Sequence, residues 1–234
     1  MIITYLMNNM GFYTDRMANL IYCDYMYGNK DLSWVRHYWN FLVDNGIFIA
    51  QTDDVTIAEV KLELDSMPNA QKINICIYKQ EWGGVPRKGF PNKHDYILIY
   101  SNGNDWKWYP DRIQIPKKMI GKGFNPSGRL TKTPCTVFDD LGNFSTMSKE
   151  RVKGADGRNI QYQKPMKLFD RVLLPFTDEN DLIIDPFMGS GSVGRWCIDN
   201  KRDYIGIEYN ASVYNIAVST LNSGEGKAQS FKDS

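Results

Sequence analysis

The stretch DPFMGSGSVG, residues 185–194, holds the residues of this chain that are best suited to bind a ligand. Gly189, Gly191 and Gly194 follow the pattern G-x-G-x-x-G, in which glycines let a ligand approach the backbone closely. Asp185 comes just before this turn, and Glu208 lies 23 residues after Asp185. An acid at the end of the next strand accepts hydrogen bonds from both hydroxyls of a ribose. The pattern therefore predicts a nucleoside site.

Asp185 indicates which kind of nucleoside ligand to expect. A dinucleotide places its pyrophosphate at the start of the helix, where a carboxylate would repel it. A cationic amino group would instead be attracted to the carboxylate. S-adenosylmethionine carries such a group and NAD does not, so the residues favour S-adenosylmethionine.

Alternating strands and helices must position these residues. We expect buried strands at 19–25, 46–54, 73–80, 95–102, 181–187 and 203–209. We expect helices at 32–46, 55–64, 163–176, 192–201 and 211–221. This alternation predicts a three-layer α/β fold around a mostly parallel sheet.

The glycine turn lies unusually late in the chain, with only 40 residues after Gly194. The strand before such a turn is central and needs neighbours on both sides. The units after Gly194 are too few for both sides, so the N-terminal strands must supply one of them. We therefore predict a circularly permuted fold with an insert between its two halves. The predicted boundaries are 1–102 and 161–222 for the halves, 103–160 for the insert and 223–234 for a flexible tail.

Basic residues concentrate in and just after the insert. From Asp105 to Leu168 there are 13 Lys and Arg against 6 Asp and Glu, a net charge of +7, although the whole chain carries only +1. The remainder therefore carries −6. Charge segregation in solvated loops is one interpretation of this asymmetry, and contact with a polyanion is the other.

Composition excludes several classes of protein. The four cysteines never form C-x-x-C and there are only two histidines, which argues against a zinc site or a disulfide framework. The first residues lack the features of a signal peptide, and no segment approaches the roughly 20 apolar residues of a membrane span. We expect a reduced, cytoplasmic protein without a metal or a membrane partner.

Several blocks of the sequence resemble DNA amino-methyltransferases of the permuted β class. DPFMGSG is similar to the family's D-P-F-x-G-S-G turn, which also lies near the C-terminus. INICIYKQ followed by FPNKHDYILIYS resembles the family's I-I-W-x-K and F-x-x-x-H-E-x-I-L stretch. IQYQKPMKL is similar to P-T-Q-K-P-x-x-L, and DNGIFIA to the G-G-x-x-x-I strand. The resemblance implies a Rossmann-like fold specific to S-adenosylmethionine-dependent methyltransferases, with the insert as a target-recognition region.

The resemblance also implies a catalytic turn. The family's D-P-P-Y motif is matched here by Asp24, Tyr25, Met26 and Tyr27. Asp24 and the carbonyl of Tyr25 would accept the hydrogens of the target amino group, which localises the nitrogen lone pair and aims it at the sulfonium methyl. Tyr27 would stack on a base that has left the duplex. Tyr25 and Met26 stand where the family has two prolines, so the turn lacks the φ restriction of proline.

The resemblance extends to the binding residues. The cofactor would contact Lys164, Asp185, Phe187, Gly189, Ser190, Gly191 and Glu208, with Lys164 at its methionine end. The candidates for contact with DNA phosphates are Lys117, Lys118, Lys122, Arg129, Lys132, Arg151 and Lys153.

We therefore expect an S-adenosylmethionine-dependent methyltransferase that modifies N6 of adenine in double-stranded DNA. Asp at position 24 favours adenine because that is the commoner pairing in the resembled family, and N4 of cytosine is the alternative. A catalytically inactive DNA-binding relative stays open, as do methylation of RNA or of a small molecule and assembly as a homodimer. The family context implies a bacterial or phage protein that acts in restriction-modification, anti-restriction or epigenetic marking.

Overall fold

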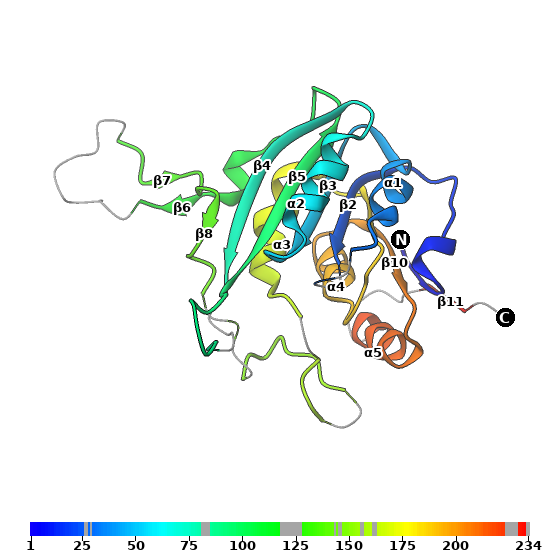
Figure 1. Cartoon of the computed structure of the whole chain (residues 1–234). Coiled ribbons are helices and arrows are strands. Elements are labelled where there is room, and N and C mark those ends of the chain that lie inside the picture. Colours follow the sequence, from blue (N-terminus) through cyan, green and yellow to red (C-terminus); the bar gives the residue numbers. More distant parts are fainter. Residues whose placement is uncertain are drawn as a thin grey trace.

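Figure 1 shows the fold of the chain in a computed structural model. The structure describes residues 1–25, 28, 30–80, 85–117, 128–142, 144, 147–154, 157–160, 163–222 and 229–232.

One large sheet forms the centre of the described part. Its strands are β1 (Ile2–Leu6), β2 (Ala18–Asp24), β3 (Leu42–Thr52), β4 (Ala70–Lys79), β5 (His94–Asn102), β8 (Val137–Phe138), β9 (Leu182–Asp185), β10 (Asp203–Glu208) and β11 (Gln229–Lys232). Their order across the sheet is β11-β1-β10-β9-β2-β3-β5-β4-β8. All neighbours from β11 to β3 are parallel, and β5 is antiparallel to both β3 and β4.

Helices cover both faces of this sheet. They are needed because successive side chains of a strand point to opposite faces and, in the central strands, the side chains on both faces are apolar. In β2, Leu20 and Tyr22 belong to one buried cluster, whereas Ile21 and Cys23 belong to the other. The first cluster packs against α3 (Met166–Leu173), α4 (Ser192–Asp199) and α5 (Ala211–Asn222). The second packs against α1 (Ser33–Trp39) and α2 (Ile57–Asp65) (Figure 1). The predicted three-layer α/β fold is thereby confirmed.

β9 occupies the position that the glycine turn requires. It pairs with β10 on one side and with β2 on the other, so strands from both ends of the chain flank it. In an open sheet, ligands bind beyond the carboxyl ends of the strands at such a point. The circular permutation predicted from the late glycine turn is therefore present.

Several details of the secondary structure differ from the prediction, including strands β6 (Ile115–Pro116), β7 (Thr131–Lys132) and β8 in the segment predicted as the insert. The helix expected at 32–46 ends at Trp39, and β3 already begins at Leu42. The apolar spacing continues to Leu42, but this residue pairs with Ala18 of β2. Asn45, with φ 61°, lies at an irregularity within β3 and does not end the helix. The strand β1 was not predicted, and β11 lies within the segment predicted to be a flexible tail.

Part of the segment predicted as the insert packs against residues 174–178. The short helix Pro110–Ile113 follows Tyr109, whose amide donates to Pro175 O at 2.8 Å. Arg112 donates to Thr177 O at 2.6 Å and to Asp178 Oδ1 at 2.8 Å. β6 and β7 form a separate two-stranded sheet, which projects from the body (Figure 1).

Among the described helices, none combines the length and the apolar composition needed to cross a bilayer.

Candidate active site

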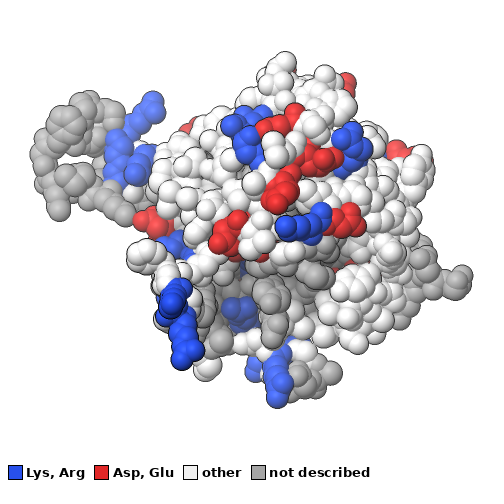
Figure 2. All heavy atoms as spheres, in the orientation of Figure 1, with Lys and Arg blue, Asp and Glu red and all other residues white. Residues whose placement is uncertain are grey.

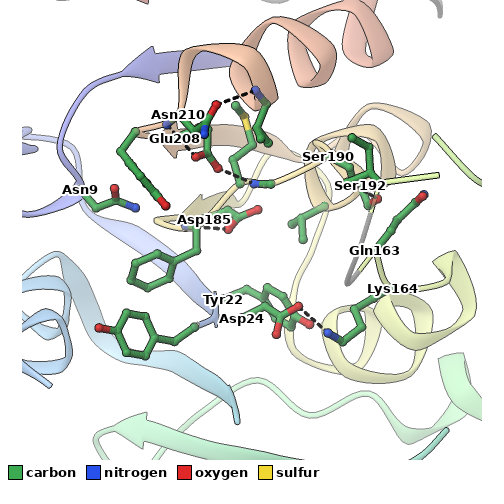
Figure 3. Close-up of a pocket in the computed structure, with 18 of the residues that line it drawn as sticks. Asn9, Tyr22, Asp24, Gln163, Lys164, Asp185, Ser190, Ser192, Glu208 and Asn210 are labelled. Atoms are coloured by element: carbon green, nitrogen blue, oxygen red, sulfur yellow. Dashed lines mark hydrogen bonds and ion pairs between the residues drawn. The ribbon is translucent and has the colours of Figure 1, made fainter. Parts of the chain in front are cut away.

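A cavity of about 590 Å³ lies at the carboxyl ends of β9, β2 and β10 (Figure 3). Its size is within the usual range for sites that bind small molecules. Figure 3 shows Asp24 and Lys164 at one end, Glu208 and Asn210 at the other, and Asp185 between them. The cavity brings together these residues predicted from the sequence: Asp24, Tyr25, Lys164, Asp185, Phe187, Gly189, Ser190 and Glu208.

Asp185 is a buried carboxyl group, and within the described part of the chain its hydrogen bonds come from a hydroxyl and an amide and not from a cation. The Tyr204 hydroxyl donates to Oδ2 at 3.1 Å, and the Phe187 amide donates to Oδ1 at 3.2 Å. Burial raises the pKa of Asp185 to about 8, against the opposing effect of these two hydrogen bonds. A buried carboxyl of this kind favours a ligand that brings its own positive charge.

The three glycines of the turn serve two different purposes. Gly189 and Gly191 have φ of 53° and 80°, and Gly191 immediately precedes α4. Gly194 lies within α4, where a Cβ atom would come within 2.7 Å of Tyr204 and 2.8 Å of Leu221. The first two glycines therefore shape the turn, and the third allows α4 to pack closely against the sheet.

Glu208 connects the glycine turn to the loop after β10. The Gly189 amide donates to its Oε2 at 3.1 Å, and the Asn210 amide donates to its Oε1 at 2.9 Å. Burial raises the pKa of Glu208, and these backbone hydrogen bonds oppose the rise. The carboxylate is thus held in one orientation at the end of the cavity that the glycine turn forms.

Lys164 lies at the other end of the cavity, against Asp24. Its Nζ is 2.7 Å from Asp24 Oδ2, and the Lys164 side chain is only 7% exposed (Figure 3). Lys164 directly precedes Pro165, which is the N-cap of α3, so α3 fixes its approach to β2. Contact between Lys164 and the cofactor stays a prediction, since Lys164 lines the cavity, and its described ion pairs are with Asp24 and Asp95.

A row of polar side chains behind Asp24 was not predicted. Tyr22 donates to Gln51 Oε1 at 2.5 Å, and Gln51 Nε2 donates to Asp95 Oδ2 at 2.7 Å. Asp95 Oδ2 is also 3.6 Å from Lys164 Nζ. The sequence carried a signal for these contacts. Asp24, Gln51 and Asp95 are polar residues near the ends of three strands, on the face where the preceding or following residues are apolar.

Aromatic side chains form the wall beside Asp24. The ring of Tyr25 lies 5.0 Å from that of Trp34 and 4.9 Å from that of Phe187, measured between centroids. Tyr25 and Phe187 both line the cavity. Met26 and Tyr27, the other two residues of the predicted catalytic turn, lie outside the described residues.

The predicted DNA contacts fall into two groups. Lys117, Arg129 and Lys132 lie in and beside β6 and β7, whereas Arg151 and Lys153 lie close to the cavity. Lys118 and Lys122 lie outside the described residues. Figure 2 shows basic side chains on the projecting β6–β7 sheet and along the lower edge, whereas acidic and basic side chains are mixed on the upper face.

Gln163 attaches the second group to the body. Its Oε1 accepts from the Val152 amide at 2.9 Å, and its Nε2 donates to Glu150 O at 2.7 Å. A second hollow of about 580 Å³, lined by Arg151 and Lys153, shares Gln163 and Ser192 with the first cavity. The basic segment is therefore held directly beside the candidate active site.

Solved structures support the fold. The M1.HpyAVI–SAM complex matches with a TM-score of 0.69 and 19% identity, covering 94% of this chain and 100% of that one. PvuII DNA methyltransferase, which is cytosine-N4-specific, matches with a TM-score of 0.69 and 12% identity, covering 92% of this chain and 84% of that one. These likenesses show that the fold is that of the Rossmann-like DNA methyltransferases.

Sequence comparisons identify the family. The type II methyltransferase M.HpaI of Haemophilus parainfluenzae is 28% identical over 137 residues, which cover 58% of this chain and 40% of M.HpaI. Against the first three curated relatives, the matches span 40%, 60% and 42% of their lengths. The family model described as DNA methylase (N6_N4_Mtase) matches residues 22–219. Because this match covers most of the chain, the protein belongs to the N6_N4_Mtase family of DNA methylases.

Proposed function

We propose that this protein is an S-adenosylmethionine-dependent DNA methyltransferase that modifies the N6 amino group of adenine. The observation that carries the proposal is the single cavity that joins the Gly189–Glu208 end to the Asp24–Lys164 end in a chain of this family. One end suits a nucleoside with a cationic amino acid moiety. The other end presents a carboxylate that can accept hydrogen bonds from an amino group.

The residues present fit S-adenosylmethionine. Asp185 is 2% exposed and has a raised pKa, so a ligand ammonium group would stabilise its charged form. Glu208 can accept hydrogen bonds from ribose hydroxyls while its two oxygens retain the Gly189 and Asn210 amides. A Cβ atom at Gly189 would meet only Phe187 O, at 3.8 Å, so it is the positive φ of 53° that favours glycine in this turn. When bound, S-adenosylmethionine supplies an electrophilic methyl group.

Among the residues of this chain, Asp24 has the main role in the reaction. Lys164 contacts its Oδ2, and a carboxylate accepts hydrogen bonds at both oxygens. Accepting an amino hydrogen localises the nitrogen lone pair, which is otherwise delocalised into the ring of the base. The methylated nitrogen then releases a proton, which Asp24 can accept. Because no strong base is needed, positioning provides most of the rate enhancement.

The target base must leave the duplex to reach the cavity. Tyr25 and Phe187 offer an aromatic wall on which a planar base can stack. The basic group of Arg151 and Lys153 beside the cavity suits the phosphates next to an extruded nucleotide. These features support a nucleic-acid substrate over a small molecule.

The choice of adenine rests on Asp24, which is the commoner partner of adenine in families with this motif. Methylation at N4 of cytosine is the second candidate, since PvuII DNA methyltransferase, which shares the fold, is cytosine-N4-specific. The same geometry serves both reactions, because both targets are exocyclic amino groups.

The test is to incubate the protein with duplex DNA of mixed sequence and methyl-labelled S-adenosylmethionine, digest the DNA and identify the labelled nucleoside. Label at N6 of adenine is expected. Label at N4 of cytosine would overturn the choice of base and keep the mechanism. No label in DNA, with cofactor binding intact, would refute the proposed activity and favour a DNA-binding protein whose Tyr25–Met26 turn no longer supports catalysis. An RNA of the same sequence serves as the control substrate.

A further inference from the structure

One face of the sheet changes from apolar to polar at the edge that borders the cavity. Along β2 the residues on this face end in Asp24, along β3 they end in Gln51, and β5 begins on this face with Asp95. Asp24 is opposite Gln51 in the parallel pair, and Gln51 is opposite Ile97 in the antiparallel pair. Asp95 is two residues before Ile97 and therefore on the same face, so alternation and register bring the three polar side chains together at one edge of this face.

Lys164 is shared between the two carboxylates at this edge. Its Nζ is 2.7 Å from Asp24 Oδ2 and 3.6 Å from Asp95 Oδ2. The Lys164 and Asp95 side chains are 7% and 5% exposed, whereas that of Asp24 is 20% exposed. Asp24 lines the cavity, and Asp95 lies behind it. Asp24 is thus the cavity-facing partner of the Lys164 ammonium group, and Asp95 is its enclosed partner.

Gln51 holds the enclosed partner in place. It donates from Nε2 to Asp95 Oδ2 at 2.7 Å, and its amide orientation is fixed by the hydroxyl of Tyr22 on Oε1. All three side chains come from adjacent strands of the sheet, so their positions are as rigid as the sheet itself.

We propose that Asp95 is a positioning residue, which acts through Lys164 to fix the catalytic carboxylate of Asp24. A buried ammonium group is costly without a counter-charge. Asp95 supplies a counter-charge that does not take part in the reaction. Lys164 therefore stays in place when Asp24 redirects its hydrogen bonds to the target amino group. The inference rests on the proposed function, because it assigns a role in the same reaction.

The test is the variant Asp95→Asn, assayed for methyl transfer to duplex DNA. We expect kcat to fall by about 10- to 100-fold, the loss that follows a small displacement of a reacting group. The KM for S-adenosylmethionine is expected to stay unchanged, because Asp95 does not line the cavity. Asp95→Glu keeps the charge and is expected to recover part of the lost kcat.

Asp140→Asn is the matched control. Asp140 forms an ion pair with the buried Arg171 at 2.8 Å, and neither residue lines the candidate site. The control therefore also removes a carboxylate from a mostly buried cation. We expect it to lower the melting temperature and to leave kcat unchanged. Equal losses of kcat in the two variants would show a general effect on folding and overturn the inference.

A double-mutant cycle tests whether Asp95 acts through Lys164. In a Lys164→Met background, Asp95→Asn is expected to cause no further loss of kcat, because the group through which it acts is gone. Additive losses would overturn the inference, as would a rise in the KM for cofactor at constant kcat. A wild-type protein that transfers no methyl group would refute the proposed function itself. An active wild type with a fully active Asp95→Asn variant would refute only the role of Asp95.

Discussion

Asp24 and Asp185 end neighbouring parallel strands and line one cavity, yet they are held in different ways. Asp24 has the ammonium group of Lys164 at 2.7 Å, whereas Asp185 has the hydroxyl of Tyr204 and the amide of Phe187. Burial raises the pKa of Asp185 to about 8. One carboxyl group has a cation from the protein, and we propose that the other receives one from a ligand. Different environments would then give two roles to the same residue type.

The largest effect is expected from Asp24→Ala, which removes the acceptor at the reacting amino group. Loss of one such hydrogen bond in a transition state lowers kcat by about 100- to 1000-fold. The Kd for S-adenosylmethionine, measured by calorimetry, should change little, because Asp24 is at the opposite end of the cavity from Glu208 (Figure 3). A loss of cofactor affinity that matches the loss of kcat would break the distinction between the two carboxylates.

Asp185→Asn is expected to show the reverse pattern. The amide keeps an oxygen for the Phe187 amide but loses the charge that would pair with the ligand ammonium. A hydrogen bond to a charged group contributes about 1.5 kcal/mol, so we expect the Kd for S-adenosylmethionine to rise about tenfold. Methylthioadenosine lacks the amino acid moiety and is the control ligand, for which the Kd should stay unchanged. Glu208→Gln should weaken both ligands, because both contain the ribose.

The pH dependence of stability sharpens the same comparison. The pKa of Asp185 is about 8 in the folded protein and about 4 in an unfolded chain, so the folded state binds more protons between these values. The free energy of unfolding of the cofactor-free protein should therefore decrease as the pH rises from about 4 to 8, by at most about 1.4 kcal/mol per pH unit. Urea unfolding at pH 6, 7 and 8 measures this slope. Asp185→Asn should reduce it, and an unchanged slope would assign it to other groups.

Much of this arrangement was predictable from the sequence. The apolar runs before Asp24, Asp185 and Glu208 placed each acid at the end of a strand, and parallel pairing brings those ends to one edge. The late glycine turn indicated the permuted strand order. Each of these inferences rests on a short local pattern in the sequence, and the sheet then brings the residues of these patterns together.

Contacts between distant segments were harder to predict. Lys164 lies 140 residues after Asp24 in the chain, and only the packing of α3 against β2 shows that the two meet. The contact between Asp95 and Gln51 was not predictable, because the register between β3 and β5 is not visible in either strand alone. Helical spacing at 32–46 was misleading for a related reason, since pairing of Leu42 with Ala18 outweighs the local preference for a helix.

The smallest effect is expected on the outer surface, where we propose that single basic side chains contact DNA. Lys153→Gln and Lys132→Gln should each weaken duplex binding modestly and reduce the slope of log K against log salt by about one, because each removes one phosphate contact. Lys201→Gln is the control, since Lys201 is 72% exposed, lies outside the basic segment and pairs with Glu179. Fluorescence anisotropy at several salt concentrations measures both quantities. Lys153 lines the hollow beside the cavity and Lys132 lies on the projecting sheet, so a change in slope for Lys153 alone would confine the DNA path to the side of the cavity where that hollow lies.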